Sequence, residues 1–97
     1  MRSAYAVLGL EPSASTEAIR HAYRRLAKLH HPDRAGEDPS AHQRFLEIRA
    51  AFEILGDPAR RAAYDREPTE AQDEALALEL RRRRLARRRA RLMRLYD

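Results

Sequence analysis

The chain has 97 residues with 20 Lys or Arg and 15 Asp or Glu, which gives a net charge of +5. This length suits one small domain with an extension. Cysteine is absent, so disulfides, thiolate metal sites and thiol catalysis are excluded. The N-terminal apolar run is too short for a signal peptide, and no stretch reaches the roughly 18 apolar residues that span a bilayer. We therefore expect a soluble, cytoplasmic protein without a transmembrane segment.

Helix-forming residues dominate the chain, and no alternating run of β-branched residues predicts a strand. A short first helix is expected at residues 4–8, ended by Gly9. The second helix is expected at residues 16–30, with Ser15 as its N-cap. Its apolar stripe is formed by Ile19, Ala22, Tyr23, Leu26 and Ala27. The basic residues lie off this stripe: Arg20, Arg24, Arg25 and Lys28.

A loop is expected at residues 31–39, because Pro32 restricts the residue before it and donates no amide proton. The third helix is expected at residues 40–55, where Ser40 and Gln43 match a capping box, and Gly56 suits a left-handed cap after it. The apolar stripe of this helix consists of Phe45, Ile48, Ala51, Phe52 and Leu55. Two long amphipathic helices joined by a short loop predict an antiparallel hairpin with the loop exposed at one end.

Asp57 and Pro58 suit the N-cap and first residue of a short fourth helix that ends near Tyr64. Beyond Pro68, residues 70–96 predict one long Arg-rich helix. The net charge is +1 over residues 1–68, from 11 basic and 10 acidic residues, and +4 over residues 69–97, from nine and five. We therefore divide the chain into residues 1–67 and a basic helical extension at residues 68–97.

This layout resembles the J-domain family. The tripeptide His31-Pro32-Asp33 would be weak evidence alone, but further segments match in family order and spacing. These segments are residues 5–9, 19–27, 45–55, 57–58 and 60–65. The resemblance implies an all-α J-domain fold, in which the second and third helices form the antiparallel hairpin and the first and fourth helices are short.

The resemblance also implies a function. The chain would be a co-chaperone that stimulates the ATPase of a DnaK-type heat-shock protein 70 chaperone, with no cofactor, no small-molecule substrate and no bond chemistry of its own. His31, Pro32 and Asp33 would contact the nucleotide-binding domain of that partner. The second-helix surface that would meet its negative patch consists of Tyr23, Arg20, Arg24, Arg25 and Lys28. Basic side chains steer such encounters, and a carboxylate accepts charge-assisted hydrogen bonds from a partner arginine.

Two other interpretations of the histidines lack support. The spacing of His21, His30, His31 and His42 matches no known zinc pattern, so we expect no metal site. His31 with Asp33 could indicate acid–base catalysis, yet no nucleophile or Gly-rich phosphate loop accompanies the pair. We therefore expect no enzymatic activity.

The C-terminal helix leaves several interpretations open. One stripe gathers Leu78, Leu85, Leu92 and Tyr96, and Arg82 and Arg89 interrupt it. The helix could bind RNA or the ribosome, lie on an anionic membrane, pack on the rest of the chain, self-associate, or stay solvated. The candidate polyanion-binding residues are Arg81, Arg82, Arg83, Arg84, Arg87, Arg88 and Arg89. The alternative function is therefore a nucleic-acid- or ribosome-binding protein that uses a J-like scaffold only structurally.

Overall fold

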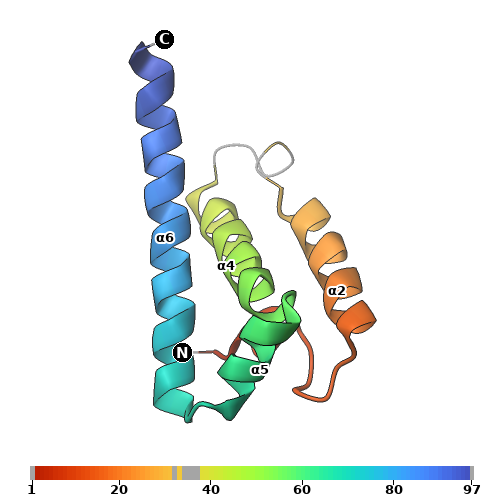
Figure 1. Ribbon diagram of the computed structural model, residues 1–97. Helices are drawn as coiled ribbons and strands as arrows, with labels where there is room; N and C mark the ends of the chain where they lie inside the picture. Colours follow the sequence, from red (N-terminus) through yellow and green to blue (C-terminus); the bar gives the residue numbers. More distant parts are fainter. Residues whose placement is uncertain (1, 32, 34–37, 97) are drawn as a thin grey trace.

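The computed structural model describes residues 2–31, 33 and 38–96, and these residues form five α-helices and no strand (Figure 1). In chain order the helices are α1 (Ala4–Val7), α2 (Thr16–Leu29), α4 (Pro39–Leu55), α5 (Pro58–Arg66) and α6 (Thr69–Tyr96). Helices α2 and α4 lie side by side and run in opposite directions, and α4 lies between α2 and α6 (Figure 1). The predicted all-α class and the antiparallel hairpin are confirmed.

Two of the predicted helix starts are confirmed in detail. The Ser15 hydroxyl accepts a hydrogen bond from the Ala18 amide at the start of α2, at 3.0 Å. At the start of α5, the Asp57 carboxylate accepts one from the Ala59 amide at 3.1 Å. Each cap satisfies an amide group that has no partner within its own helix, which stabilises the first turn.

The ends of α4 differ from the prediction. Asp38 caps the helix by accepting from the Ser40 amide at 3.0 Å, and Pro39 is the first helical residue. The predicted capping box of Ser40 and Gln43 is therefore wrong, and the Gln43 amide group donates to Glu47 instead. Asp38 outcompetes Ser40 because proline in the first turn needs no amide partner and fixes where the helix begins.

Gly56 follows α4 with a φ of −78°, so the predicted left-handed cap is also wrong. The residue is small for a different reason. A Cβ atom there would lie 2.7 Å from the backbone oxygen of Phe52 and 2.8 Å from its ring. Glycine is required at this position by close packing. The one positive φ among the described residues belongs to Gly9, at 71°.

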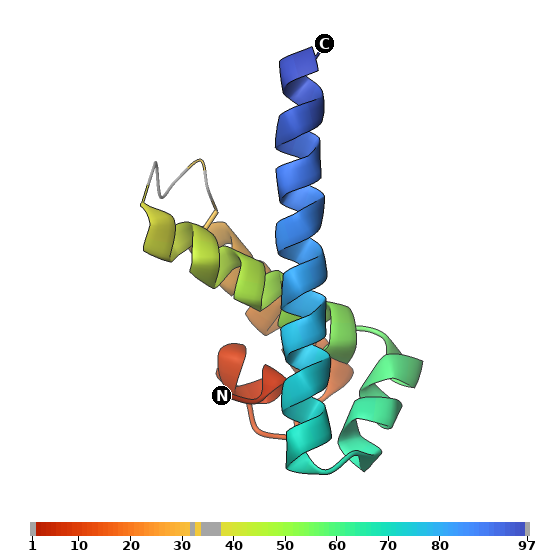
Figure 2. The ribbon, with the colours of Figure 1, turned by 90° about the vertical axis from the view of Figure 1, so that its left-hand side faces the viewer.

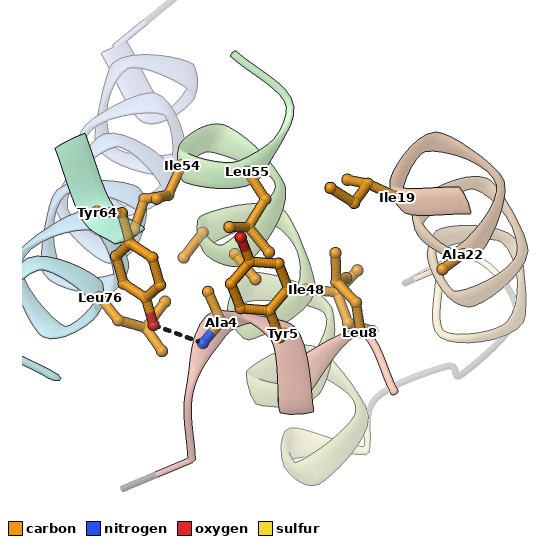
Figure 3. Close-up of a cluster of buried hydrophobic side chains, with 12 residues drawn as sticks. Ala4, Tyr5, Leu8, Ile19, Ala22, Ile48, Ile54, Leu55, Tyr64 and Leu76 are labelled. Carbon is orange, nitrogen blue, oxygen red and sulfur yellow. Dashed lines mark hydrogen bonds between the residues drawn. The ribbon is translucent and has the colours of Figure 1, made fainter. Parts of the chain in front are cut away.

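The core lies where α1, α4 and α5 meet, with α2 and α6 packed against it on either side of α4 (Figure 3). Its members are Ala4, Tyr5, Leu8, Ile19, Ala22, Ile48, Ala50, Ala51, Ile54, Leu55, Tyr64 and Leu76. The buried tyrosines keep their hydroxyls bonded, because an unpaired buried hydroxyl is costly. Tyr64 accepts from the Ala4 amide at 3.0 Å (Figure 3). Tyr5 donates to Asp65 at 2.7 Å.

Helix α6 packs its first half against α4 and still contacts α4 at Arg83 and Arg87, while its last turns project past the end of the hairpin (Figures 1 and 2). Leu76 on α6 is only 4 % exposed and belongs to the core, with Ala75 and Leu80 packed beside it. Packing on the rest of the chain, one of the interpretations left open above, therefore applies to this half. In the part of the chain that the structure describes, no helix is long and apolar enough to cross a bilayer.

Candidate functional site

The tripeptide lies at the loop end of the hairpin, and two of its three residues are described. The backbone N–H of Asp33 donates to Nδ1 of His31 at 3.2 Å, and the edge of the imidazole packs on the Phe45 ring, with centroids 5.5 Å apart. Because Nδ1 accepts this bond, the proton of the neutral ring is on Nε2. Pro32 lies outside the described residues.

The Asp33 side chain is more exposed than the His31 side chain. The His31 side chain is 51 % exposed, while the Asp33 carboxylate is 95 % exposed and lies 3.7 Å from the imidazole. Because the Asp33 carboxylate is farther from Nδ1 than the Asp33 amide is, the amide hydrogen bond is the better-defined interaction of Nδ1. Phe45 thus orients the imidazole from α4, and the carboxylate is left accessible to a partner.

The basic face of α2 lies beside this loop. Arg20, Arg24, Arg25 and Lys28 are all exposed, and none of them forms a salt bridge with any described residue. Tyr23 is half-buried instead, because its ring stacks on Phe52 of α4 with centroids 4.0 Å apart and planes 6° from parallel. This face therefore presents four exposed cations, and the apolar stripe on the other side of α2 packs against α4.

The structure separates the candidate polyanion-binding arginines into two groups. Arg83 is 26 % exposed and pairs with Glu53 of α4 and Glu79, while Arg82 approaches Glu79 at 3.5 Å. Arg87 contacts the ring of His42 on α4. Within the described residues, no salt bridge engages the remaining exposed members, which are Arg81, Arg84, Arg88 and Arg89.

The sequence reasoning did not identify one cluster that holds α6 in place. Glu79 is 5 % exposed, and its carboxylate accepts from Arg60 of α5 at 3.0 Å as well as facing Arg82 and Arg83. Arg60 also donates to the backbone oxygen of Glu53 at 3.1 Å. The predicted pair of Glu79 with Arg83 is present, but nothing in the sequence around Glu79 points to Arg60, 19 residues earlier.

Two other predicted features can be placed. His21 is exposed, His30 is half-buried at the end of α2, and His42 lies in the first turns of α4. Among the residues for which the structure gives coordinates, no group of three or more His, Asp or Glu side chains gathers as metal ligands would.

The helical arrangement and the position of the tripeptide can now be set beside known proteins. The sequence matches the DnaJ domain family over residues 3–65. This chain belongs to the DnaJ domain family. The match includes the hairpin, the tripeptide and α5, so the J-domain fold predicted from the resemblance is confirmed, and α6 lies beyond the matched residues.

Named relatives of this J domain agree with that assignment. The chaperone protein DnaJ of Bordetella petrii is 48 % identical over 65 residues, which cover 67 % of this chain and 17 % of the relative. The chaperone protein DnaJ of Dictyoglomus thermophilum is 49 % identical over 61 residues, which cover 63 % and 15 %. The chain thus spans about a sixth of the length of these curated relatives.

A solved structure shares the fold. The crystal structure of the J-Trx1 fragment of ERdj5 superposes with a TM-score of 0.63 at 40 % sequence identity. The superposition covers 67 % of this chain and 31 % of that one. This likeness agrees with the J-domain fold of the chain.

Proposed function

We propose that this chain stimulates the ATPase of a DnaK-type heat-shock protein 70 chaperone, in the cytoplasm, and performs no bond chemistry itself. The observation that carries the proposal is the exposed Asp33 carboxylate beside an oriented His31, in a chain of the DnaJ domain family. Its relatives carry the name chaperone protein DnaJ. Pro32, the middle residue of the tripeptide, is included in this proposal on its sequence position alone.

The proposed contact has two parts with different physical roles. Asp33 accepts a charge-assisted hydrogen bond from an arginine of the chaperone, and His31 supplies a donor at Nε2. The cations of α2 face acidic residues of the chaperone, which raises the rate of encounter and fixes its orientation. Stimulation then follows if binding favours the hydrolysing conformation of the chaperone over the others.

An ATPase assay with purified DnaK-type chaperone tests this proposal. We expect the wild-type chain to raise the steady-state rate, and the His31→Gln variant to leave the rate at its basal value. His21→Gln is the matched control, since His21 is also exposed but lies outside the tripeptide. Circular dichroism should show that all three proteins are equally helical, because exposed substitutions usually change stability by less than about 0.5 kcal/mol. Full stimulation by a folded His31→Gln variant would refute the mechanism and favour a J-like scaffold with a purely structural role.

We also propose that the arginines of α6 bring the J domain to a polyanion, RNA or the ribosome. The supporting observation is the group of exposed arginines with no salt bridge among the described residues: Arg81, Arg84, Arg88 and Arg89. Binding to phosphates releases condensed counterions, so the affinity should fall linearly with salt concentration on logarithmic axes.

The test compares variants that leave the attachment of α6 intact. Replacing Arg81, Arg84, Arg88 and Arg89 by Gln should weaken binding to a homopolymer RNA and flatten its salt dependence. Replacing four exposed arginines outside α6 by Gln (Arg2, Arg20, Arg44 and Arg66) changes the net charge equally and should have a smaller effect. Equal losses would mean that only overall charge matters, and no RNA binding at low salt would refute the proposal.

A further inference from the structure

The outward side of α6 carries a row of leucines that are about half exposed. Leu78, Leu85 and Leu92 follow one another at intervals of seven residues and are 54 %, 53 % and 48 % exposed. At about 3.6 residues per turn they lie on the side of the helix opposite Leu76 and Arg83, which face α4. Single exposed leucines are common, but a row with a period of seven is the pattern of a helix that packs along another helix.

The charges that flank Leu85 and Leu92 are all positive. Residues 80–96 contain nine arginines and no Asp or Glu. Arg82 and Arg89 lie on the same face as the leucines, in the alternate position of the seven-residue repeat, and Arg81 and Arg88 lie at its edge. We call this surface the leucine–arginine seam: Leu78, Arg81, Arg82, Leu85, Arg88, Arg89 and Leu92.

A second copy of this chain is a poor occupant for the seam. Pairing two copies in either direction with their leucine rows in register would place the four seam arginines of one copy against the four of the other, with no carboxylate on residues 80–96 to offset them. In a parallel pair, Arg82 of one copy would face Arg82 of the other across the interface, and Arg89 would face Arg89. Like charges opposed in this way disfavour the dimer.

A lipid surface fits less well than a protein. Helices that lie on membranes keep an uninterrupted apolar face with their cations on the polar side. In α6 the exposed Arg82 and Arg89 lie among the leucines, so burying the row in lipid would bring two guanidinium groups with it. The seam needs a partner that supplies both apolar side chains and carboxylates.

We propose that the seam pairs with an acidic amphipathic helix of another protein, which places apolar residues against the three leucines and carboxylates against Arg82 and Arg89. The seam is accessible for this purpose, because α4 covers the opposite side of α6 and the last turns of α6 project past the end of the hairpin (Figures 1 and 2). Carboxylates from the partner would also relieve the repulsion among the arginines. This inference is independent of the proposed chaperone contact, which uses other residues.

A binding experiment with the full chain tests the proposal. The probe is a synthetic peptide of roughly three heptads with Leu at one core position and Glu at the other core position and the flanks. We expect it to bind in the micromolar range and to become helical, and we expect a scrambled peptide of the same composition to bind at least about tenfold more weakly. Equal binding of the two peptides would overturn the proposal, because charge alone would then suffice.

Two variants locate the contact. Replacing Leu85 and Leu92 by Ser should reduce affinity for the peptide at least about tenfold, or about 1.4 kcal/mol, without changing the charge. Replacing Ala77 and Ala90 by Ser is the matched control, since both are exposed on α6 but lie off the seam. An unchanged affinity of the leucine variant would refute the seam.

The other possible occupants give results that overturn the proposal. Leucine-dependent dimers in sedimentation would indicate a second copy. Leucine-dependent binding to phosphatidylserine vesicles that exceeds binding to the peptide would indicate a membrane. A loss of homopolymer RNA binding in the leucine variant would show that RNA occupies the leucine row and would overturn the proposal. Retained RNA binding with lost peptide binding would support it, because the two proposals share Arg81, Arg88 and Arg89 but not the leucines.

Discussion

Helices α2 and α6 lie on opposite sides of α4, and both are rich in arginine, but they are attached in different ways (Figure 1). Helix α2 is attached by apolar side chains such as Ile19 and Ala22, and its exposed cations form no salt bridge with another described residue. Helix α6 is attached by Leu76 and by ion pairs around Glu79, while its longest apolar row stays exposed. The position of a basic surface in the sequence therefore does not tell whether its charges serve attachment or recognition.

The largest expected effect tests which side of α6 holds it to the body. Leu76→Ala should destabilise the protein by about 2–4 kcal/mol, because it removes buried methyl groups and leaves a cavity. Leu85→Ala is the matched control, since it makes the same chemical change at a side chain that is 53 % exposed. Its effect should stay within about 0.5 kcal/mol. Urea unfolding followed by circular dichroism measures both, and equal effects would mean that α6 is not attached through Leu76 in solution.

This contrast shows how far the sequence could predict the fold. Helix α2 has a single apolar stripe, so its periodicity was enough to identify Ile19 and Ala22 as the buried side. Helix α6 has two apolar rows, and the sequence reasoning singled out the longer one, through Leu85, which is exposed. The row through Leu76 is the buried one because Leu76 joins the core cluster that contains Ile54 of α4 and Tyr64 of α5, which the periodicity of one helix does not reveal.

The second prediction tests the ionic part of the attachment. Glu79→Gln keeps the shape of the side chain but leaves Arg60 and Arg83 without their shared carboxylate. We expect a loss of about 1–2 kcal/mol, below the value for a fully buried pair, because Arg60 is 39 % exposed. Glu74→Gln, at an exposed position of α6, should change the stability little. If both variants lose the same stability at low salt, the cluster does not attach α6.

The third prediction concerns α2, whose cations we assign to recognition. Reversing Arg24 and Arg25 to Glu should slow association with the chaperone by about tenfold at low salt, and the difference should shrink at high salt. Stopped-flow binding at two salt concentrations measures this. The same reversal at Arg2 and Arg66, which are exposed on elements remote from the tripeptide, is the control. Equal slowing by both pairs would show that net charge, rather than the α2 face, governs the encounter.

The candidate site shows the same division between what a sequence does and does not reveal. Local spacing in the sequence was enough to predict the tripeptide, the α2 cations and the caps at Ser15 and Asp57. The packing of His31 on Phe45 depends on how α2 and α4 are brought together, which local spacing does not reveal. The start of α4 at Asp38 was open to prediction, because Asp38-Pro39 repeats the Asp-Pro pattern that identified the start of α5 at Asp57.

The smallest expected effect concerns two neighbouring arginines of α5 that face opposite ways. Arg60 reaches forward to α6, whereas Arg61 reaches back to α1, where its Nε donates to the Tyr5 hydroxyl at 3.0 Å. The Tyr5 hydroxyl in turn donates to Asp65 at 2.7 Å. This second link lies within residues 3–65, which match the DnaJ domain family, and does not involve α6. Tyr5→Phe should therefore cost about 1 kcal/mol without releasing α6.

The pH dependence distinguishes this link from the attachment of α6. Burial, together with the hydrogen bond to Asp65, raises the pKa of Tyr5 above its usual value of 10.0. The folded state therefore holds the phenol proton more tightly than the unfolded state, so this stabilisation is fully present below about pH 10 and is lost as the pH rises through the folded pKa. The stability difference between the wild type and Tyr5→Phe should accordingly narrow above pH 10, as thermal unfolding at several pH values would measure. Glu79→Gln provides the control, because it changes a carboxylate in the attachment of α6 and leaves the Tyr5 phenol in place. A deficit of Tyr5→Phe that stays constant up to pH 11 would show that the Tyr5 hydroxyl is not buried between Arg61 and Asp65.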